Sequence, residues 1–535
     1  MLRRALLVVA LIVAPGVVRA QSQATYTNPI LYADYSDPDV IRVGNDYYMV
    51  ASSFHFSPGI PVLRSRDLVH WSIIGHVLPR LPFGLAYDLP GPHTLTDAIS
   101  RPVGPGARHA GGVWAPTIRH HEGLFYVYWA TPDEGVFMST AQRPEGPWTI
   151  PTTLIQGPGY EDPGPFWDDD GQAWLIHSRV GAGPLILHRM SPDGRRVLDE
   201  GETIVEDRVN LPVLEGPKLY KRNGWYYIFA PIGGVERGSQ AVGRARSLRG
   251  PYEWRTVLEP GATAIQGPHQ GGWVETPSGQ GWFAHFNSTG AFGRIVHLQP
   301  LRWVDDWPLI GEPIPGRVSG QPVPVHAMPD TGSPPTGDRL QDSDEFAGRA
   351  LGLQWSWNHN PVNTAWSLSR RPGWLRLAAL PSDHLVTARN TLTQILQGPR
   401  TTISTRIDVR NMAEGQRGGL AMFGVRPSWI GVVRSGGHNR VTLAAEGVET
   451  AGPELTRRTV ELRVEVGPDQ TALYAFSLDD GRTFQRWGDP IPLARFSWWK
   501  GSRPSLFSFI RPPREGAAPQ GWIDVDWFRV ERASQ

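Results

Sequence analysis

A short aromatic pattern recurs five times along this chain. Its copies span residues 46–50 (DYYMV), 124–128 (LFYVY), 173–177 (AWLIH), 225–229 (WYYIF) and 281–285 (GWFAH). Each copy is rich in aromatic and β-branched residues and closely follows a glycine, as β-strands that begin after a turn do. Repetition of one such unit along a chain points to a repeat architecture.

The spacing of the copies indicates which kind of repeat architecture the chain forms. The reference aromatic residues are Tyr47, Phe125, Trp174, Tyr226 and Trp282. Successive ones are 78, 49, 52 and 56 residues apart, and the last three intervals match a four-stranded propeller blade. We therefore predict an all-β fold that begins with a five-bladed β-propeller. The longer first interval holds a Gly- and Pro-rich insertion from Leu81 to Ala110, expected to form an extended loop at one rim.

A second feature stands roughly ten residues before each aromatic strand. The five segments are Asp37-Pro38, Trp114-Ala115-Pro116, Asp162-Pro163, Glu215-Gly216-Pro217 and Gly267-Pro268-His269. If the aromatic strand is the second of its blade, these segments begin the innermost strands beside the propeller axis. We then expect them to converge on one pocket.

Three of these axial segments carry carboxylates, Asp37, Asp162 and Glu215. Hydrolysis of a glycoside needs one acid to protonate the leaving oxygen and one base to activate water. Like charges gathered in one pocket raise the proton affinity of at least one of them. We expect the longer Glu215 to be the acid, Asp37 the base, and Asp162 the charge that keeps Glu215 protonated and oriented.

A single Asp-Pro pair is by itself more often a turn than a catalytic group. Prolines after Asp37 and Asp162 do remove a backbone donor and stiffen the turn, which fixes the direction of each carboxylate. Other acidic residues that lack the axial spacing are expected to be ordinary turn residues. They are Asp39, Asp168, Asp169 and Asp170.

The C-terminal part of the chain has a different pattern. Residues 311–337 are rich in Pro and Gly, which indicates a connecting segment. From Asp344 onward short alternating strands predict an antiparallel β-sandwich. We place the propeller at residues 25–325, the linker at 326–340 and the sandwich at 341–535.

The N-terminal end and the charge balance restrict location and partners. Residues 1–20 have Arg3 and Arg4, an apolar run and small residues before a cleavage point near Gln21, as a signal peptide does. The apolar run is shorter than the ~20 residues of a membrane span, so we expect a secreted or periplasmic protein. Lys and Arg number 52 and Asp and Glu 51, which favours a neutral ligand over nucleic acid or an anionic membrane.

Several of these motifs together resemble glycoside hydrolase family 43, the inverting β-xylosidases and α-L-arabinofuranosidases. The matching segments, within about residues 28–308, are 36–42 (SDPDVIR) with 46–48 (DYY), 114–116 (WAP), 161–163 (EDP), and 215–217 (EGP) with 224–227 (GWYY). The resemblance implies a general base at Asp37, an orienting and pKa-modulating carboxylate at Asp162 and a general acid at Glu215. Residues 344–530 resemble the concanavalin-like sandwich of the β-xylosidase branch.

The same resemblance suggests further site residues. It implies that His269 lies beneath the sugar and that Arg294 donates to sugar hydroxyls. Phe54 and Trp114 are stacking candidates that could equally be packing residues. No cofactor is expected, although some relatives hold a calcium ion on the axis, here near His269. Some relatives also close the pocket with an aromatic sandwich loop; Phe496, Trp498 and Trp499 are candidates, but the sequence does not identify the loop.

The expected function is the release of terminal β-D-xylose from xylan or arabinoxylan fragments. An α-L-arabinofuranosidase, or an enzyme with both activities, stays open because the two sugars present similar hydroxyl patterns. A non-catalytic polysaccharide-binding protein is a remoter alternative, disfavoured by three carboxylates in one pocket. The insertion and the sandwich favour a blocked pocket over the open cleft of an endo-acting enzyme. The oligomeric state is not indicated by any feature of the sequence.

Overall fold

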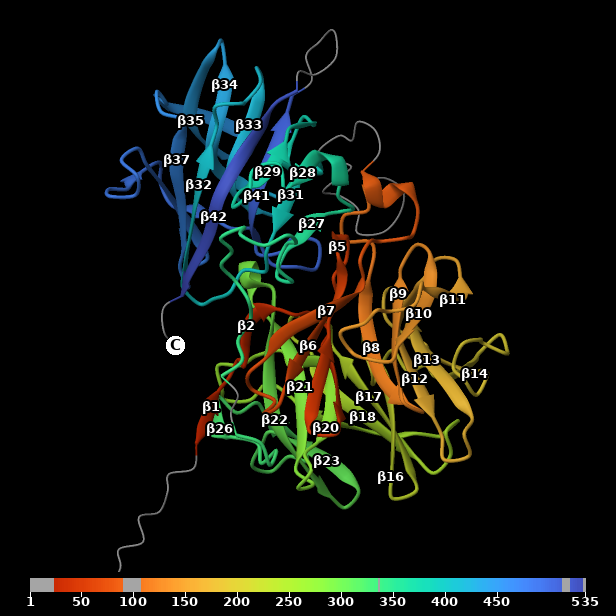
Figure 1. Ribbon diagram of the computed structural model, residues 1–535. Coiled ribbons are helices and arrows are strands. Elements are labelled where there is room, and N and C mark those ends of the chain that lie inside the picture. The colour runs from red at the N-terminus through yellow and green to blue at the C-terminus, as the bar shows by residue number, and fades with distance from the viewer. Residues whose placement is uncertain (1–23, 90–106, 335–336, 512–519, 533–535) are drawn as a thin grey trace, which may run out of the picture.

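Five β-sheets arranged around one axis form the N-terminal part of the chain, and a β-sandwich lies against one of their faces (Figure 1). The computed structural model describes residues 24–89, 107–334, 337–511 and 520–532. The expected signal peptide and residues 90–106 of the insertion lie outside these ranges. In the described ranges no helix is long and apolar enough to cross a membrane. The 3-10 helices are η1 (Leu85–Asp88), η2 (Gly290–Phe292), η3 (Asn363–Ala365) and η4 (Leu385–Thr387).

Each blade of the propeller is an antiparallel sheet of four strands, numbered here from the axis outward. Blade I has β3 (Asp39–Val43), β4 (Asp46–Val50), β6 (Gly59–Ser65) and β7 (Ser72–Leu78). Blade II has β8 (Trp114–His121), β9 (Leu124–Thr131), β10 (Gly135–Ala141) and β11 (Thr152–Gln156). Blade III has β12 (Tyr160–Trp167), β13 (Ala173–Arg179), β14 (Leu185–Met190) and β15 (Glu202–Val205).

The last two blades include strands from both ends of the domain. Blade IV has β16 (Lys218–Arg222), β17 (Trp225–Ile232), β18 (Ser239–Ala245) and β19 (Glu253–Leu258), extended by β25 (Gly320–Gln321) and β24 (Glu312–Pro313). Blade V has β20 (His269–Glu275), β21 (Gly281–Ser288), β22 (Arg294–Val304) with β23 (Trp307–Ile310), and β2 (Leu31–Asp34). Strand β2 comes from the N-terminal end, so it closes the ring. Beside it β1 (Thr25–Thr27) pairs with β26 (Val325–Ala327).

The five aromatic segments form the second strand of each blade, and the five-bladed propeller predicted from them is confirmed. In β9, Phe125, Val127 and Trp129 pack in the core between blades I and II. The alternate residues Tyr126 and Tyr128 pack in the core between blades II and III. Because a strand inside a propeller is covered on both faces, it can be apolar at every position. This explains why these strands show no polar alternation.

The innermost strands share a kink where they begin. One residue in each blade has a left-handed backbone: Asp37 (φ 54°), Ala115 (φ 33°), Asp162 (φ 56°), Gly216 (φ 58°) and Gln270 (φ 38°). In three blades the kink coincides with a shift of strand register. For the four residues other than Gly216 such a conformation costs of order 1–3 kcal/mol, and strained residues tend to cluster at functional sites.

Two stacked sheets form the C-terminal sandwich. One is β36 (Val448–Glu454), β35 (His438–Ala445), β34 (Ser428–Ser435), β33 (Gln416–Phe423), β41 (Arg503–Ile510), β31 (Thr391–Thr393) and β27 (Ser356–Asn358), with β30 (Leu380–Pro381) beside β41. The other is β28 (Trp366–Ser367), β29 (Leu375–Ala378), β42 (Trp522–Arg532), β32 (Thr401–Asp408), β37 (Thr459–Val466), β38 (Thr471–Ser477) and β39 (Gln485–Arg486), with β40 (Ile491–Pro492) beside β38. Their facing apolar side chains form one core.

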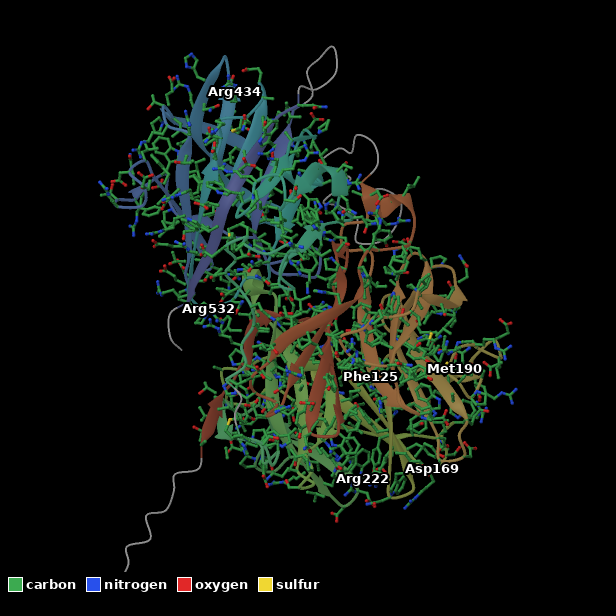
Figure 2. All side chains as sticks on the ribbon, in the orientation of Figure 1. Phe125, Asp169, Met190, Arg222, Arg434 and Arg532 are labelled. Carbon is green, nitrogen blue, oxygen red and sulfur yellow. The ribbon has the colours of Figure 1, made fainter. Side chains whose placement is uncertain are left out.

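The two domains share backbone pairing and a hydrophobic core. Strand β5 (Phe56–Ser57), from a loop of blade I, pairs with β27 at the edge of the sandwich. Phe56 and the described ends of the insertion pack with sandwich residues such as Phe423 and Trp498. Residue Arg222, at the far end of β16, lies on the opposite side of the propeller (Figure 2). The face where the innermost strands begin is therefore the face that the sandwich covers.

Candidate active site

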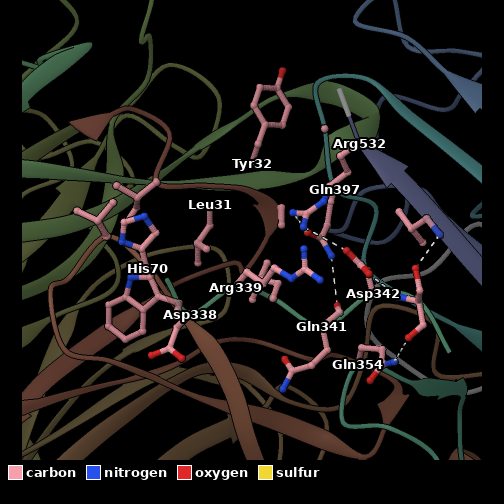
Figure 3. Close-up of a pocket in the computed structure, with 18 residues that line it drawn as sticks. Leu31, Tyr32, His70, Asp338, Arg339, Gln341, Asp342, Gln354, Gln397 and Arg532 are labelled. Carbon is pink, nitrogen blue, oxygen red and sulfur yellow. Dashed lines mark hydrogen bonds and ion pairs between the residues drawn. The ribbon is translucent and has the colours of Figure 1, made fainter. Parts of the chain in front are cut away.

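In the described part of the chain, two cavities of several hundred cubic ångströms lie where the propeller meets the sandwich. The larger, about 880 Å³, is a polar crevice between β2, the turn at Trp71 and the linker (Figure 3). Its Asp342 is paired with Arg532 at 3.1 Å, and none of the three predicted carboxylates lines it. The smaller, about 360 Å³, lies on the propeller axis and is lined by all three predicted catalytic carboxylates. Asp37, Asp162 and Glu215 thus lie in one pocket, as we predicted.

The repeat places these acids in two different positions. Asp37 and Asp162 are themselves the kinked residues of blades I and III. Glu215 stands one residue before the kink of blade IV, the position that Glu161 occupies in blade III. The expectation of equivalent positions is therefore off by one residue for Glu215. The same alignment reveals Glu161, a fourth carboxylate lining the pocket.

Asp37 is held by donors on both oxygens. Arg294 donates from Nη1 to Oδ1 at 2.8 Å, and the Ser52 hydroxyl donates to Oδ2. The Ser52 oxygen accepts in turn from the backbone N–H of Ala115 in blade II, at 2.7 Å. A charge-assisted bond and a hydroxyl bond together fix the position of this carboxylate. This arrangement suits a base that must be correctly directed.

Asp162 lies among other acids. Its carboxylate accepts the backbone N–H of Gly216 at 2.7 Å, and oxygens of Glu161, Asp162 and Glu215 lie within 4.8 Å of one another. Burial, and then the charges of Glu215 and Asp37, raise the pKa of Asp162 to about 7. Burial, and then the charges of Asp162 and Glu215, raise the pKa of Glu161 to about 9. The cluster therefore holds protons at neutral pH.

Glu215 contacts His269. The Oε1 atom of Glu215 lies 3.1 Å from Nε2 of His269, whose ring is fully buried. His269 is not among the residues that line the cavity. The structure thus places it behind Glu215, where it limits the orientations open to that side chain.

Positive charge lies below the pocket. The buried Lys218 donates to the Thr117 hydroxyl at 2.8 Å, and burial lowers its pKa. Asp39 is not the turn residue that we expected, because it begins β3, is fully buried and accepts from Arg119 at 2.7 Å. Asp168 does begin a turn, because its carbonyl accepts the backbone N–H of Gly171, and its side chain accepts from the Lys221 ammonium. Lys218 offsets part of the negative charge above it.

Aromatic side chains from both domains surround the carboxylates. Phe54 and Trp114 line the cavity and contact each other edge to face, with ring centroids 6.2 Å apart. Trp499 of the sandwich also lines the cavity, 6.0 Å from the Trp114 ring. Phe496 packs against Trp499 and is half exposed, whereas Trp498 is buried against His109. Of the three candidate sandwich aromatics, only Trp499 lines the pocket.

The sandwich also supports the neighbours of Asp37. The buried Lys500 donates to the carbonyls of Asp34 and Ser52, each at 3.1 Å, and its ammonium lies 3.5 Å from the Asp34 carboxylate. Burial lowers the pKa of Lys500 to about 8. Ser52 is the residue that donates to Asp37. One sandwich segment thus provides a pocket wall and supports the expected base.

Comparison with known proteins accounts for this arrangement. The profile of the glycosyl hydrolases family 43 matches residues 26–308. The chain belongs to glycosyl hydrolase family 43. The profile of the β-xylosidase C-terminal concanavalin A-like domain matches residues 343–531. The family and the sandwich type predicted from the motifs are confirmed, and the chain is a glycoside hydrolase.

Family 43 relatives match the chain over nearly its full length. A Xylanibacter ruminicola protein with the provisional name β-xylosidase is 43% identical, covering 92% of this chain and 88% of its own. A Formosa agariphila β-xylosidase is 34% identical, covering 96% and 91%. A solved structure of an engineered family 43 enzyme, described as having both endo-xylanase and exo-arabinofuranosidase activity, is 28% identical with a TM-score of 0.82. It covers 95% of this chain and 100% of its own.

Because some relatives hold a calcium ion on the axis, the sequence leaves a calcium ion beside His269 open. The carboxylate that contacts this imidazole is Glu215. Calcium takes six to eight oxygen ligands, and imidazole nitrogen suits it poorly. The contacts of His269 therefore do not fit a calcium site.

A second group of possible ligands lies at the domain junction. His55, His109 and His359 are buried, with ring centroids 4.7–5.0 Å apart. However, His359 directs one nitrogen to Asn358 Oδ1 at 2.8 Å and the other to the carbonyl of Ala107. Both nitrogens of His359 therefore already face oxygens of the protein, which leaves this ring poorly placed to bind a metal. The cluster fits a hydrogen-bonded junction between domains better than a metal site.

Proposed function

We propose that this enzyme releases terminal β-D-xylose from xylo-oligosaccharides, with inversion at the anomeric carbon. The observation that carries the proposal is the axial pocket, in which carboxylates from three blades face a small cavity. Its aromatic walls are Phe54, Trp114 and Trp499. A neutral sugar ring can stack on such walls while its hydroxyls meet the polar groups.

The walls favour attack on chain ends. Trp499, contributed by the sandwich, meets Trp114 at the rim, and Phe54 lies beside Trp114. A long polysaccharide needs an open groove to lie across the axis, whereas a walled pocket accepts the end of a chain. The geometry therefore supports removal of single terminal sugars.

The roles of the acids follow from their surroundings. Asp37, held by Arg294 and Ser52, activates the attacking water. Glu215, the carboxylate with 17% of its side chain exposed, protonates the leaving oxygen. Asp162 orients the acid from the neighbouring blade. Arg294, besides its bond to Asp37, lines the cavity and has further N–H groups for sugar hydroxyls.

The xylosidase assignment follows the names of the two relatives that match the chain nearly end to end. An α-L-arabinofuranosidase is the second candidate, because the engineered structural neighbour is described as having that activity. A terminal arabinofuranose fits the same polar and aromatic features. Substrate comparison separates the two proposals.

The test compares aryl β-D-xyloside, aryl α-L-arabinofuranoside, xylobiose and arabinan. We expect the highest kcat/KM on the β-xyloside, activity on xylobiose and none on the interior of arabinan. Proton NMR of early hydrolysis should show α-xylose as the first product. First-formed β-xylose would refute inversion, and a higher kcat/KM on the arabinofuranoside would reverse the two candidates.

We further propose that the protein is exported. The basis is the pattern of residues 1–20. Expression of the full chain in a bacterial host should give active protein in the periplasm or medium, with an N-terminus near Gln21. Cytoplasmic protein with an uncleaved N-terminus would contradict export.

A further inference from the structure

Glu161 is a buried pocket carboxylate to which the chemistry above gives no role. Only 4% of the residue is exposed, yet it lines the axial cavity. In the repeat it corresponds to Glu215, one blade further on. A second glutamate at the position of the expected acid requires an explanation.

The protein itself occupies one oxygen of this carboxyl group. Oε1 of Glu161 accepts the backbone N–H of Ala182 at 3.0 Å and the hydroxyl of Ser178 at 3.3 Å. Both donors lie at the end of β13 and in the loop that follows. These bonds fix the orientation of the carboxyl group and leave Oε2 as the oxygen available to the cavity.

The charges around Glu161 favour its neutral form. Oxygens of Asp162 and Glu215 lie within 4.8 Å of it. Over the described part of the chain, no Lys, Arg or His forms an ion pair with Glu161, whereas Asp37 has Arg294. Burial and two neighbouring acids raise the pKa of Glu161. Since Oε1 already accepts two hydrogen bonds, the proton belongs on Oε2.

A sugar needs donors as well as acceptors from its pocket. Each hydroxyl can donate one hydrogen bond and accept others, but an ionised carboxylate only accepts. Part of the guanidinium of Arg294 is engaged with Asp37. A neutral carboxyl group can supply a donor without adding another negative charge.

We propose that Glu161 binds the terminal sugar as a neutral carboxylic acid, with Oε1 held by the protein and the Oε2 hydrogen donated to one sugar hydroxyl. This inference rests on the proposed function. Glu161 is then a specificity residue for the hydroxyl pattern of the terminal sugar. A glutamine has the same shape, acceptor and donor, so it should replace Glu161.

The experiment pairs variants with substrates that lack single hydroxyls. Wild type, Glu161→Gln and Glu161→Ala are assayed on an aryl β-D-xyloside and on its 2-, 3- and 4-deoxy analogues. Ser178→Ala is the matched control, because it removes a donor to Oε1 but keeps the carboxyl group. Ratios of wild type to variant on each substrate cancel the intrinsic reactivity of the analogue.

On the parent xyloside we expect Glu161→Ala to lower kcat/KM about tenfold, the value of one hydrogen bond, mainly through KM. Glu161→Gln should stay within about threefold of wild type. On one deoxy analogue, wild type, Glu161→Gln and Glu161→Ala should have the same kcat/KM, because the hydroxyl that Glu161 binds is missing. Ser178→Ala should have a small and equal effect on all four substrates.

An equal loss for Glu161→Ala on all four substrates would refute the proposal and leave Glu161 as a support for the loop at Ala182. A Glu161→Gln variant as poor as Glu161→Ala would also refute it. If Glu161→Ala does not fold, Glu161→Met fills the space without a donor and gives the same comparison. Failure of wild type to cleave any xyloside would instead refute the proposed function.

Discussion

Asp37 and Asp162 occupy the same place in two blades and have opposite surroundings. Both are kinked, with φ of 54° and 56°, and both precede a proline. Asp37 is bound by a guanidinium and a hydroxyl, whereas Asp162 has a single backbone N–H and lies among acids. The propeller repeat thus determines where a carboxylate lies, and the neighbouring blades determine its chemistry.

The largest effect that this comparison predicts is on catalysis. Asp37→Asn should lower kcat by roughly 10²- to 10⁴-fold, the usual contribution of a general base. The loss should be similar for good and poor leaving groups, because every substrate needs the water. Steady-state kinetics on a series of aryl xylosides measures this effect. A loss of kcat confined to substrates with poor leaving groups would show that Asp37 acts as an acid and not as the base.

A smaller effect should follow from the sandwich residue behind Asp37. Lys500→Met keeps the packing but removes the ammonium that holds the carbonyl of Ser52. We expect kcat to fall roughly 10- to 100-fold through misplacement of Asp37, with a smaller change in KM. Lys221→Met, which loses an ammonium bound to Asp168, is the matched control. An unchanged kcat with a lower Tm would mean that Lys500 only supports the fold.

The smallest effect is on stability, and it has opposite signs for the two acids. The folded protein raises the pKa of Asp162 to about 7 from its ordinary 3.8, so it binds that proton more tightly than the unfolded chain does. Stability from this group is therefore complete below about pH 4 and is lost as the pH rises to 7. Asp162→Asn should gain Tm relative to wild type over this window, by about 1–4 °C.

Asp37→Asn is the counterpart in the same thermal scans. It leaves the buried Arg294 without its partner, so its Tm should fall. Equal Tm shifts for both variants at every pH would show that the two carboxylates have the same effect on stability.

The sequence predicts the fold class because the repeat is local. Tyr47, Phe125 and their counterparts each belong to a strand that must be apolar on both faces, and their spacing gives the number of blades. The acids of the pocket are found because Asp37 and Asp162 each stand directly before a proline. These are signals within about fifteen residues of chain.

Other site residues depend on contacts that a linear pattern does not contain. Glu161 escapes notice because the motif aligns on Asp162, although its place one residue before the kink matches Glu215. Asp39 looks like a turn residue until Arg119 from the next blade meets it. From the other domain, Trp499 reaches the pocket and Lys500 reaches the residues behind Asp37. Only the folded junction shows which of three neighbouring aromatics lines the pocket.

The pairing of β5 with β27 ties the propeller and the sandwich together through their backbones. A loop of the propeller supplies the last strand of a sandwich sheet, so the domains cannot swing apart without breaking main-chain hydrogen bonds. A propeller inherited without its sandwich would expose an open strand edge, which invites aggregation, and would lose the indole of Trp499. We therefore expect further domains to be accommodated at the ends of this pair rather than between its members.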